Sequence, residues 1–232
     1  MRVPTRILRL TACGSLLSQH TEISVTSTLI ERNSALQGEG GCIYLTGTSK
    51  MSLANVELKA CSAGSNGGGF SMRGQSSLTL EGVNIQNCKT RGMGGGLLAA
   101  GNSVIIKGEK GTQVSVEKSR ARQGGGICCM SRIDLQGQST VLIEDNEATE
   151  DGGGIFLFSS YAKLLVSPTN RLLIQRNQAA NDGGGICLKQ GAQISVEPPL
   201  CGSSCTKQMR GNGQCDHGCM SAGCNWDEGM DL

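Results

Sequence analysis

The sequence predicts an all-β protein built as a solenoid of short strands, followed by a small cysteine-rich module. Three observations lead to this prediction. Glycine triplets that run into an apolar stretch recur with a period of about 28 residues, the apolar residues alternate as they do in strands, and residues 14–197 lack helical periodicity. The chain also has 35 glycines but only 4 prolines, which favours repeated tight turns over disorder or a collagen-like structure.

The residue before each apolar run marks the register of the repeat. A degenerate copy stands at Ser15, and the other markers are Cys42, Gly69, Gly96, Gly126, Gly154 and Gly185. Each marker is followed by an alternating apolar run and then by two further short apolar runs. Three strands per repeat, in tandem over residues 14–197, predict a right-handed parallel β-helix of about seven coils, with equivalent residues stacked about 4.8 Å apart. Two other repeat folds fit less well, because leucine-rich repeats need a helical half and propeller blades need about 40 residues per repeat.

The glycine triplet, as in Gly152–Gly154, is expected at the corner where a coil enters its first strand. Such a corner needs a positive φ or a close approach between coils, and glycine satisfies both. We therefore expect Gly154→Val to damage folding. A phosphate-binding loop is excluded because the Lys-Ser/Thr that cradles a phosphate is missing. Asparagine recurs shortly before the marker, where stacked amides can form a ladder between coils, at Asn33, Asn146 and Asn177.

Several copies share a second motif, seen in IERNSALQGEGGCIYL, IEDNEATEDGGGIFL and IQRNQAANDGGGICL. These stretches resemble the repeats of chlamydial polymorphic outer membrane proteins, which pair an apolar-x-x-Asn motif with a Gly-Gly-small-aliphatic motif. Glycine stands here where that family often has alanine, and isoleucine where it has phenylalanine. The resemblance covers about residues 14–197 and implies a β-helical, surface-exposed protein associated with adhesion.

Composition narrows the class of protein. The formal net charge is +2, so neither nucleic-acid binding nor an acidic tail is indicated. No segment approaches the roughly 18–20 apolar residues of a membrane span. The 12 cysteines indicate an oxidising compartment, but Arg6 and Arg9 interrupt the only apolar run of a signal peptide. We therefore expect a piece of a longer extracellular or cell-surface polypeptide, in which residues 1–13 are a partial N-terminal coil or cap.

Residues 198–232 form a separate cysteine-rich module. Five cysteines lie between Cys201 and Cys224 with the spacing C-x3-C-x9-C-x3-C-x4-C. A module this small needs disulfides, a metal or both. The paired C-x2-C knuckles of zinc sites are missing, and the intervening carboxylates and amides favour a hard cation with oxygen ligands.

The motifs GNGQCDHGC and CNWDEGMD closely resemble the Notch-type (LNR) repeat. The resemblance implies the disulfides Cys201–Cys224 and Cys205–Cys219, and leaves Cys215 without the family's sixth cysteine. It also implies that Ca²⁺ is bound through Asn212, the Gln214 carbonyl, Asp216, Asp227 and Asp231. Met230 stands at the family's last ligand position, and residues 207–210 contain no acid. We therefore expect weak or incomplete Ca²⁺ binding, which calorimetry on a 198–232 peptide would test.

Cys61 and Cys88 occupy one repeat position in adjacent coils. They form either a disulfide between coils or two buried thiols in the asparagine column, and the sequence leaves both interpretations open. The redox states of the remaining cysteines of the repeat region are not decided either.

Charged residues gather at the turn of one coil, at Glu144, Asp145, Glu147, Glu150 and Asp151. We expect a solvated turn there, and ion pairs between it and the basic stretch 118–123 of the neighbouring coil, because a glycosidase would need two facing carboxylates. No catalytic residue is assigned. The sequence favours a non-enzymatic extracellular or cell-surface protein that acts in adhesion, display or protein–protein contact, with a protein or glycan partner. The alternative is a polysaccharide-binding or polysaccharide-cleaving β-helix.

Overall fold

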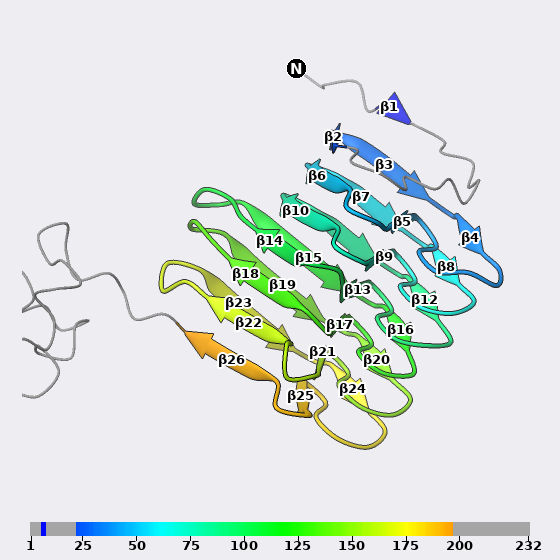
Figure 1. The fold of residues 1–232 in the computed structure, drawn as a ribbon, viewed down its shortest axis with the longest axis vertical. Helices are drawn as coiled ribbons and strands as arrows, with labels where there is room; N and C mark the ends of the chain where they lie inside the picture. The colour runs from blue at the N-terminus through cyan, green and yellow to red at the C-terminus, as the bar shows by residue number, and fades with distance from the viewer. Residues whose placement is uncertain (1–5, 8–21, 197–232) are drawn as a thin grey trace, which may run out of the picture.

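The computed structural model describes residues 6–7 and 22–196, and every regular element in that part of the chain is a β-strand. The strands wind into a rod of stacked coils in which each strand pairs in parallel with its counterparts one coil away (Figure 1). Four sheets run along the rod, which we name A to D.

Sheets A and B form two long faces of the rod. Sheet A contains β1 (Arg6–Ile7), β3 (Thr28–Glu31), β7 (Glu57–Lys59), β11 (Asn84–Gln86), β15 (Gln113–Glu117), β19 (Thr140–Glu144) and β23 (Arg171–Gln175). Sheet B contains β2 (Glu22–Thr26), β6 (Lys50–Ala54), β10 (Ser77–Glu81), β14 (Ser103–Ile106), β18 (Arg132–Leu135), β22 (Lys163–Val166) and β26 (Gln193–Val196).

Sheets C and D complete each coil. Sheet C consists of two-residue strands, β4 (Ser34–Ala35), β8 (Ser62–Ala63), β12 (Lys89–Thr90), β16 (Arg120–Ala121), β20 (Glu147–Ala148) and β24 (Gln178–Ala179). Sheet D contains β5 (Ile43–Leu45), β9 (Phe70–Arg73), β13 (Leu97–Ala100), β17 (Ile127–Cys129), β21 (Ile155–Phe158) and β25 (Ile186–Lys189). A coil runs through sheets D, B, A and C in that order.

The predicted parallel β-helix is confirmed, with two differences. Each coil has four strands rather than three, because the short strands of sheet C lie in the polar stretch where apolar alternation gives no signal. The described residues form about six coils. Ser15, the marker of the first predicted coil, lies outside the described residues, whereas the later strands of that coil, β2, β3 and β4, are described and pair with β6, β7 and β8.

The predicted register is confirmed residue by residue. The first residues of the sheet D strands stack in one column, Ile43, Phe70, Leu97, Ile127, Ile155 and Ile186. With inward-facing residues of sheets A and B they form one continuous apolar core along the rod. Because a coil cannot bury its apolar face alone, this stacking holds the fold together.

The three glycines of each corner have different physical roles. The first, such as Gly67 and Gly152, has a φ near +62° and +65°, a region that favours glycine. At the second, a Cβ on Gly68 would lie 2.3 Å from the Gly95 carbonyl oxygen of the next coil. At the third, a Cβ on Gly154 would lie 2.6 Å from the Gly185 carbonyl oxygen. The expected damage from Gly154→Val therefore has a steric cause.

The expected asparagine ladder is present at the corner between sheets A and C. The buried Asn146 donates through Nδ2 to the Val116 carbonyl at 2.8 Å and to Asn177 Oδ1 at 3.0 Å. Its own Oδ1 accepts the Ser119 backbone N–H at 3.0 Å. The amide thus satisfies backbone groups that the turn leaves free, and it links three coils.

The structure pairs Cys61 with Cys42, so the disulfide considered between Cys61 and Cys88 is not formed. Stacked side chains of parallel strands stay about 4.8 Å apart and point the same way, whereas a disulfide needs Cβ atoms about 3.8 Å apart. Cys42 instead faces Cys61 across the corner of one coil, with Cα atoms 5.4 Å apart. In the next coil Gly69 takes the place of Cys42, and Cys88 keeps a buried free thiol. The alternative of two buried free thiols is therefore correct for Cys88 and wrong for Cys61.

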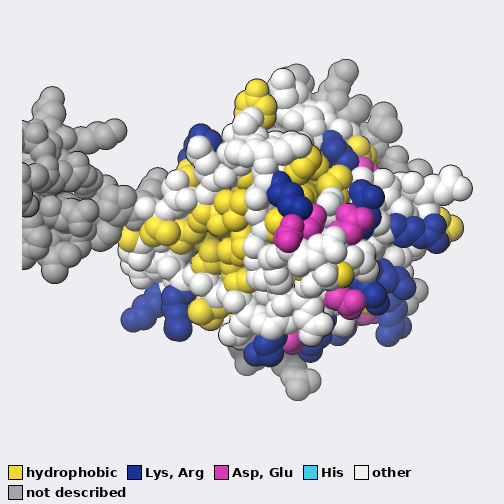
Figure 2. All heavy atoms as spheres, turned by 90° about the horizontal axis from the view of Figure 1, so that it is seen from below, with side chains coloured by type: hydrophobic (Ala, Val, Ile, Leu, Met, Phe, Trp, Pro, Cys, Tyr) yellow, Lys and Arg dark blue, Asp and Glu magenta, His cyan; other side chains and the backbone are white. Residues whose placement is uncertain are grey.

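The C-terminal end of the described rod is apolar. Figure 2 looks at this end and shows hydrophobic side chains gathered on it. No further described coil stacks on this end, so core positions become partly or fully exposed there, at Leu172, Ile174, Ile186, Leu188, Ile194 and Val196.

Candidate binding groove

A groove of about 500 Å³ runs across the coils on the outer side of sheet C. Residues from β4, β8, β12 and β16, from the segments that follow these strands, and one residue after β20 line it: Ser34, Leu36, Ser62, Ala63, Gly64, Lys89, Thr90, Arg91, Arg120, Ala121, Arg122 and Thr149. We call this surface the sheet C groove.

The alternation of a strand explains why this surface is hollow. In β16, Arg120 points outward and Ala121 inward, and Arg122 points outward again after the strand ends. Between the outward side chains, the groove is lined by the small residues Ala63 in β8 and Ala121 in β16.

The groove is basic. It contains Lys89, Arg91, Arg120 and Arg122, all exposed, and no carboxylate lines it. Two of the cations form ion pairs with the next coil, Arg120 with Glu147 at 2.9 Å and Arg122 with Glu150 at 3.8 Å. Lys89 and Arg91 have no ion pair within the described residues.

The predicted ion pairs between the basic stretch 118–123 and the acidic turn are therefore confirmed. The prediction that the acidic turn is solvated is only partly correct. Glu144 and Asp151 are buried, with 9% and 6% of their surface exposed. Glu144 accepts a hydrogen bond from Gln175 at 2.6 Å and pairs with Arg176, which also binds Asp145 at 3.0 Å. These carboxylates serve contacts between coils.

Asp151 is held by groups from three coils. Its carboxylate accepts from Lys189 Nζ at 3.0 Å, from Gln123 Nε2 at 3.3 Å and from the Asp182 backbone N–H at 3.3 Å. Burial raises the pKa of Asp151, but the hydrogen bonds from Lys189, Asp182 and Gln123 outweigh it and keep the pKa below its usual value. An ionised carboxylate with this many donors is a structural anion rather than a general acid.

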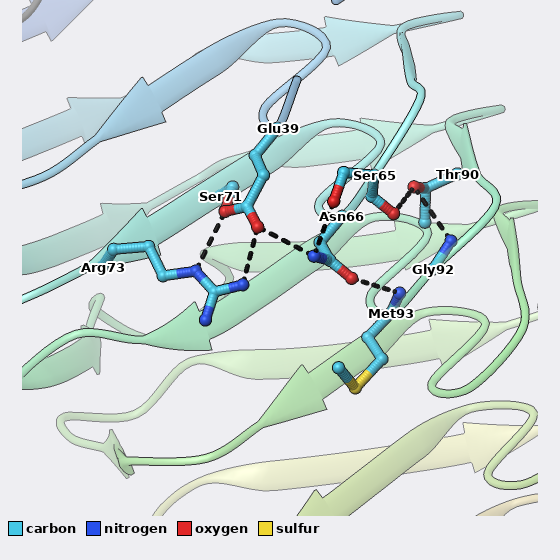
Figure 3. Close-up of polar contacts among 8 residues, drawn as sticks. All are labelled: Glu39, Ser65, Asn66, Ser71, Arg73, Thr90, Gly92 and Met93. Atoms are coloured by element: carbon cyan, nitrogen blue, oxygen red, sulfur yellow. Dashed lines mark hydrogen bonds and ion pairs between the residues drawn. The ribbon is translucent and has the colours of Figure 1, made fainter. Parts of the chain in front are cut away.

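A polar network that sequence reasoning missed fixes the first coils beside the groove (Figure 3). Glu39 accepts two hydrogen bonds from Arg73, at 2.6 and 2.9 Å, and one each from Ser71 and Asn66. Asn66 in turn accepts the Met93 N–H at 2.9 Å. Burial raises the pKa of Glu39, yet the hydrogen bonds from Arg73, Asn66 and Ser71 hold it below its ordinary value.

The network extends into the groove through Thr90. Its hydroxyl donates to the Ser65 carbonyl at 2.7 Å and accepts the Gly92 N–H at 3.4 Å. One signal for this network was available in the sequence. The residue immediately before each glycine corner occupies the same place in successive coils, and there it is Glu39, Asn66 and Met93.

The free thiols of the described residues are inert. Burial raises the pKa of Cys88 and Cys129 to about 11 and that of Cys128 to about 12. Cys128 and Cys187 belong to a second, smaller apolar cluster on the outer side of sheet D, together with Leu98 and Phe156. These thiols fill space and are not nucleophiles at neutral pH.

Within residues 6–7 and 22–196, no group of three or more His, Cys, Asp or Glu side chains could hold a metal ion. That part of the chain also contains no helix long and apolar enough to cross a membrane. The residues implied for Ca²⁺, Asn212 to Asp231, and the disulfides Cys201–Cys224 and Cys205–Cys219 lie outside the described residues.

Comparison with known families agrees with the coil geometry. The model of the right-handed β-helix region matches residues 16–198. The chain belongs to the right-handed β-helix family. This match also confirms the predicted handedness of the coils.

A second family model, the LNR domain, matches residues 198–231, next to the β-helix region. LNR domains commonly bind calcium, and a disulfide-bonded LNR domain suggests an extracellular protein. Neither a curated protein nor a solved structure matches the chain.

Proposed function

We propose that this protein is a non-enzymatic extracellular or cell-surface β-helix that binds a protein or glycan partner through the sheet C groove, in adhesion or display. One observation carries the proposal. The groove is an open surface of about 500 Å³ that spans several coils and presents four exposed cations, of which only Arg120 and Arg122 have an ion pair among the described residues. Such a surface suits an extended partner better than a small substrate, because it is not an enclosed apolar pocket.

The engagement of the acidic residues supports binding rather than catalysis. Most carboxylates of the acidic turn already contact cations of a neighbouring coil, such as Arg120, Arg176 and Lys189. The resemblance to polymorphic outer membrane protein repeats and the LNR module both favour a surface location. In the LNR module, weak Ca²⁺ binding would use Asn212, the Gln214 carbonyl, Asp216, Asp227 and Asp231.

The experiment that tests the proposal is binding of the purified, oxidised chain to intact cells. We expect saturable binding, detected by flow cytometry, that decreases when the groove cations are replaced. Absence of saturable binding to any cell type or extracellular matrix preparation would contradict the proposal.

A polysaccharide-cleaving activity is the second candidate, favoured by one observation. Glu117 and Glu144 are paired in register in adjacent coils of sheet A, and Glu144 would have to leave its contacts with Gln175 and Arg176 to act on a substrate. Glycoside hydrolysis uses two carboxylates about 5–9 Å apart. Release of reducing ends or unsaturated products from acidic or neutral polysaccharides, abolished by Glu117→Gln, would establish this activity instead.

A further inference from the structure

We propose that the sheet C groove binds an anionic polysaccharide, a carboxylated or sulfated chain that lies along the rod axis across the coils. The inference rests on the proposed function and names the chemical class of its partner. It depends on the charge, the spacing and the composition of the groove.

Two of the cations are stacked along the rod axis. Lys89 and Arg120 are partners in register between β12 and β16, so their Cα atoms differ by one coil, about 4.8 Å. Arg91 and Arg122 each follow two residues later and are exposed. The register shifts at this point, because the Arg122 N–H donates to the Gly92 carbonyl and Met93 pairs with Gln123, so these two arginines do not form a second stacked row. Four cations on two adjacent coils present a compact positive surface, and the Lys89–Arg120 row runs parallel to the direction in which a linear chain would lie.

The ion pairs with the neighbouring coil leave these cations available. The side chains in the Arg120–Glu147 pair are 60% and 48% exposed, so water screens the attraction and it contributes little. A guanidinium also has five N–H donors, and one carboxylate uses at most two. The pair therefore orients Arg120 and leaves donors for the paired N–H contacts that carboxylates and sulfates accept from arginine.

The backbone beneath the cations is fixed. Arg120 N–H donates to the Cys88 carbonyl at 2.8 Å, and Arg122 N–H donates to the Gly92 carbonyl at 2.8 Å. The Thr90 hydroxyl ties the same region to the preceding coil. A ligand therefore has to order only the ends of the side chains, which reduces the entropy lost on binding.

The composition of the groove favours a polysaccharide over a protein partner. Protein interfaces concentrate their affinity in buried aromatic anchors, and the groove has no aromatic residue. A peptide cannot add as a strand to β12 or β16, because both already have a parallel neighbour on each side. The remaining polar lining includes the Ser34 and Ser62 hydroxyls, which lie 2.9 Å apart and suit sugar hydroxyls.

The test measures binding of the full chain to heparin, to polygalacturonate, to polyglutamate as an anionic peptide and to uncharged dextran by calorimetry, in low and high salt. Two double variants are compared, Lys89→Gln with Arg91→Gln, and Lys163→Gln with Arg171→Gln. The second pair removes the same charge from exposed positions in sheets B and A, so it is a matched control. Circular dichroism verifies that both variants fold.

We expect binding to at least one polyanion, weakened about tenfold by the groove variant and less than about twofold by the control, as two exposed ion pairs predict. Binding should decrease with salt and be absent for dextran. Equal losses in both variants, equal affinity for polyglutamate, or no binding to either polyanion would overturn the inference. In the last case, persistent cell binding would leave the proposed function intact, whereas absence of cell binding would refute both.

Discussion

Gly153 gives the sharpest test of how the coils are held together. A Cβ at this position would lie 2.2 Å from the Gln178 carbonyl oxygen and 2.5 Å from the Gly184 carbonyl oxygen, both in the next coil. Neither atom can rotate away, because both belong to the backbone. In Gly153→Ala the two coils must therefore separate locally by about 1 Å, since ordinary carbon–oxygen contacts begin well above 3 Å.

The cost can be estimated from what this separation disturbs. Two backbone hydrogen bonds cross the corner here, Gly153 N–H to Gly183 O at 3.2 Å and Gly154 N–H to Gly184 O at 3.0 Å. Each contributes about 1 kcal/mol, and overpacking adds about 1–3 kcal/mol. We expect Gly153→Ala to lower the free energy of unfolding by roughly 3–5 kcal/mol, a large part of the stability of an ordinary domain.

Gly184 is the matched control, because it has the same place in the final described coil. Among the described residues, a Cβ added at Gly184 would contact only the Asn177 carbonyl oxygen, at 3.2 Å. Gly184→Ala should change stability by less than about 1 kcal/mol, since alanine also restricts the unfolded chain.

The assay is guanidinium unfolding followed by circular dichroism, with hydrogen exchange at the Ile155 and Ile186 amides. Exchange is included because a solenoid can open one coil at a time. Equal losses of stability in both variants, or no loss in Gly153→Ala, would refute the steric explanation of the glycine corner.

Three further predictions follow from contacts in the core. Asn146→Ala should lower the free energy of unfolding by about 2–3 kcal/mol, because three buried hydrogen bonds lose their partner. Asn102 is exposed, so Asn102→Ala should have almost no effect when both variants are compared by thermal unfolding. The free energy of unfolding should fall between about pH 8.5 and pH 11, because thiols of the unfolded chain ionise from about pH 8.5, whereas the buried Cys88 thiol ionises only near its raised pKa of about 11. Denaturant titrations at pH 7.5 and 10 would detect this fall, and equal stability at both pH values would contradict it. Non-reducing peptide mapping should recover Cys42 linked to Cys61, and a Cys61–Cys88 peptide would show that the pairing is wrong.

The register of the rod could be predicted because stacking copies one constraint into every coil. A residue at a corner faces its own counterpart in the next coil, so the requirement for glycine at Gly69 recurs at Gly96 and Gly126. A pattern that recurs at one period can therefore be recognised in a single sequence.

The groove could not be predicted because it depends on the fourth strand of the coil. A strand of two residues, such as Lys89–Thr90, is too short to display alternation. The outward direction of Lys89 and the inward direction of Thr90 therefore follow only from their pairing with Arg120 and Ala63. The glutamate network was missed for a related reason, since Glu39 and Arg73 lie 34 residues apart and come together only through stacking.

The partner of Cys61 was missed because stacking alone suggested Cys88. At the third position of the corner, Gly69 and Gly96 approach β-methyl groups, Cγ2 of Ile85 and Cγ1 of Val116. In the first complete coil the residue in that register is Leu58, which has no such methyl group. The side-chain contact is therefore relieved at Cys42, whereas the close approach of a carbonyl oxygen from the next coil, 2.7 Å from a Cβ on Gly69, is not explained by Leu58. Cys42 bonds to Cys61 across the corner.

The location of this bond also determines how the rod would respond to pulling along its axis. The disulfide joins two residues 19 apart within one coil and does not connect neighbouring coils. Coils would therefore peel away one by one under load, with each releasing roughly 90 Å of chain at about 3.4 Å per residue. The coil that contains the Cys42–Cys61 disulfide would release about 60 Å less while the disulfide is intact, because the 19-residue loop stays closed. Single-molecule stretching would therefore show one short step, which reductant would lengthen.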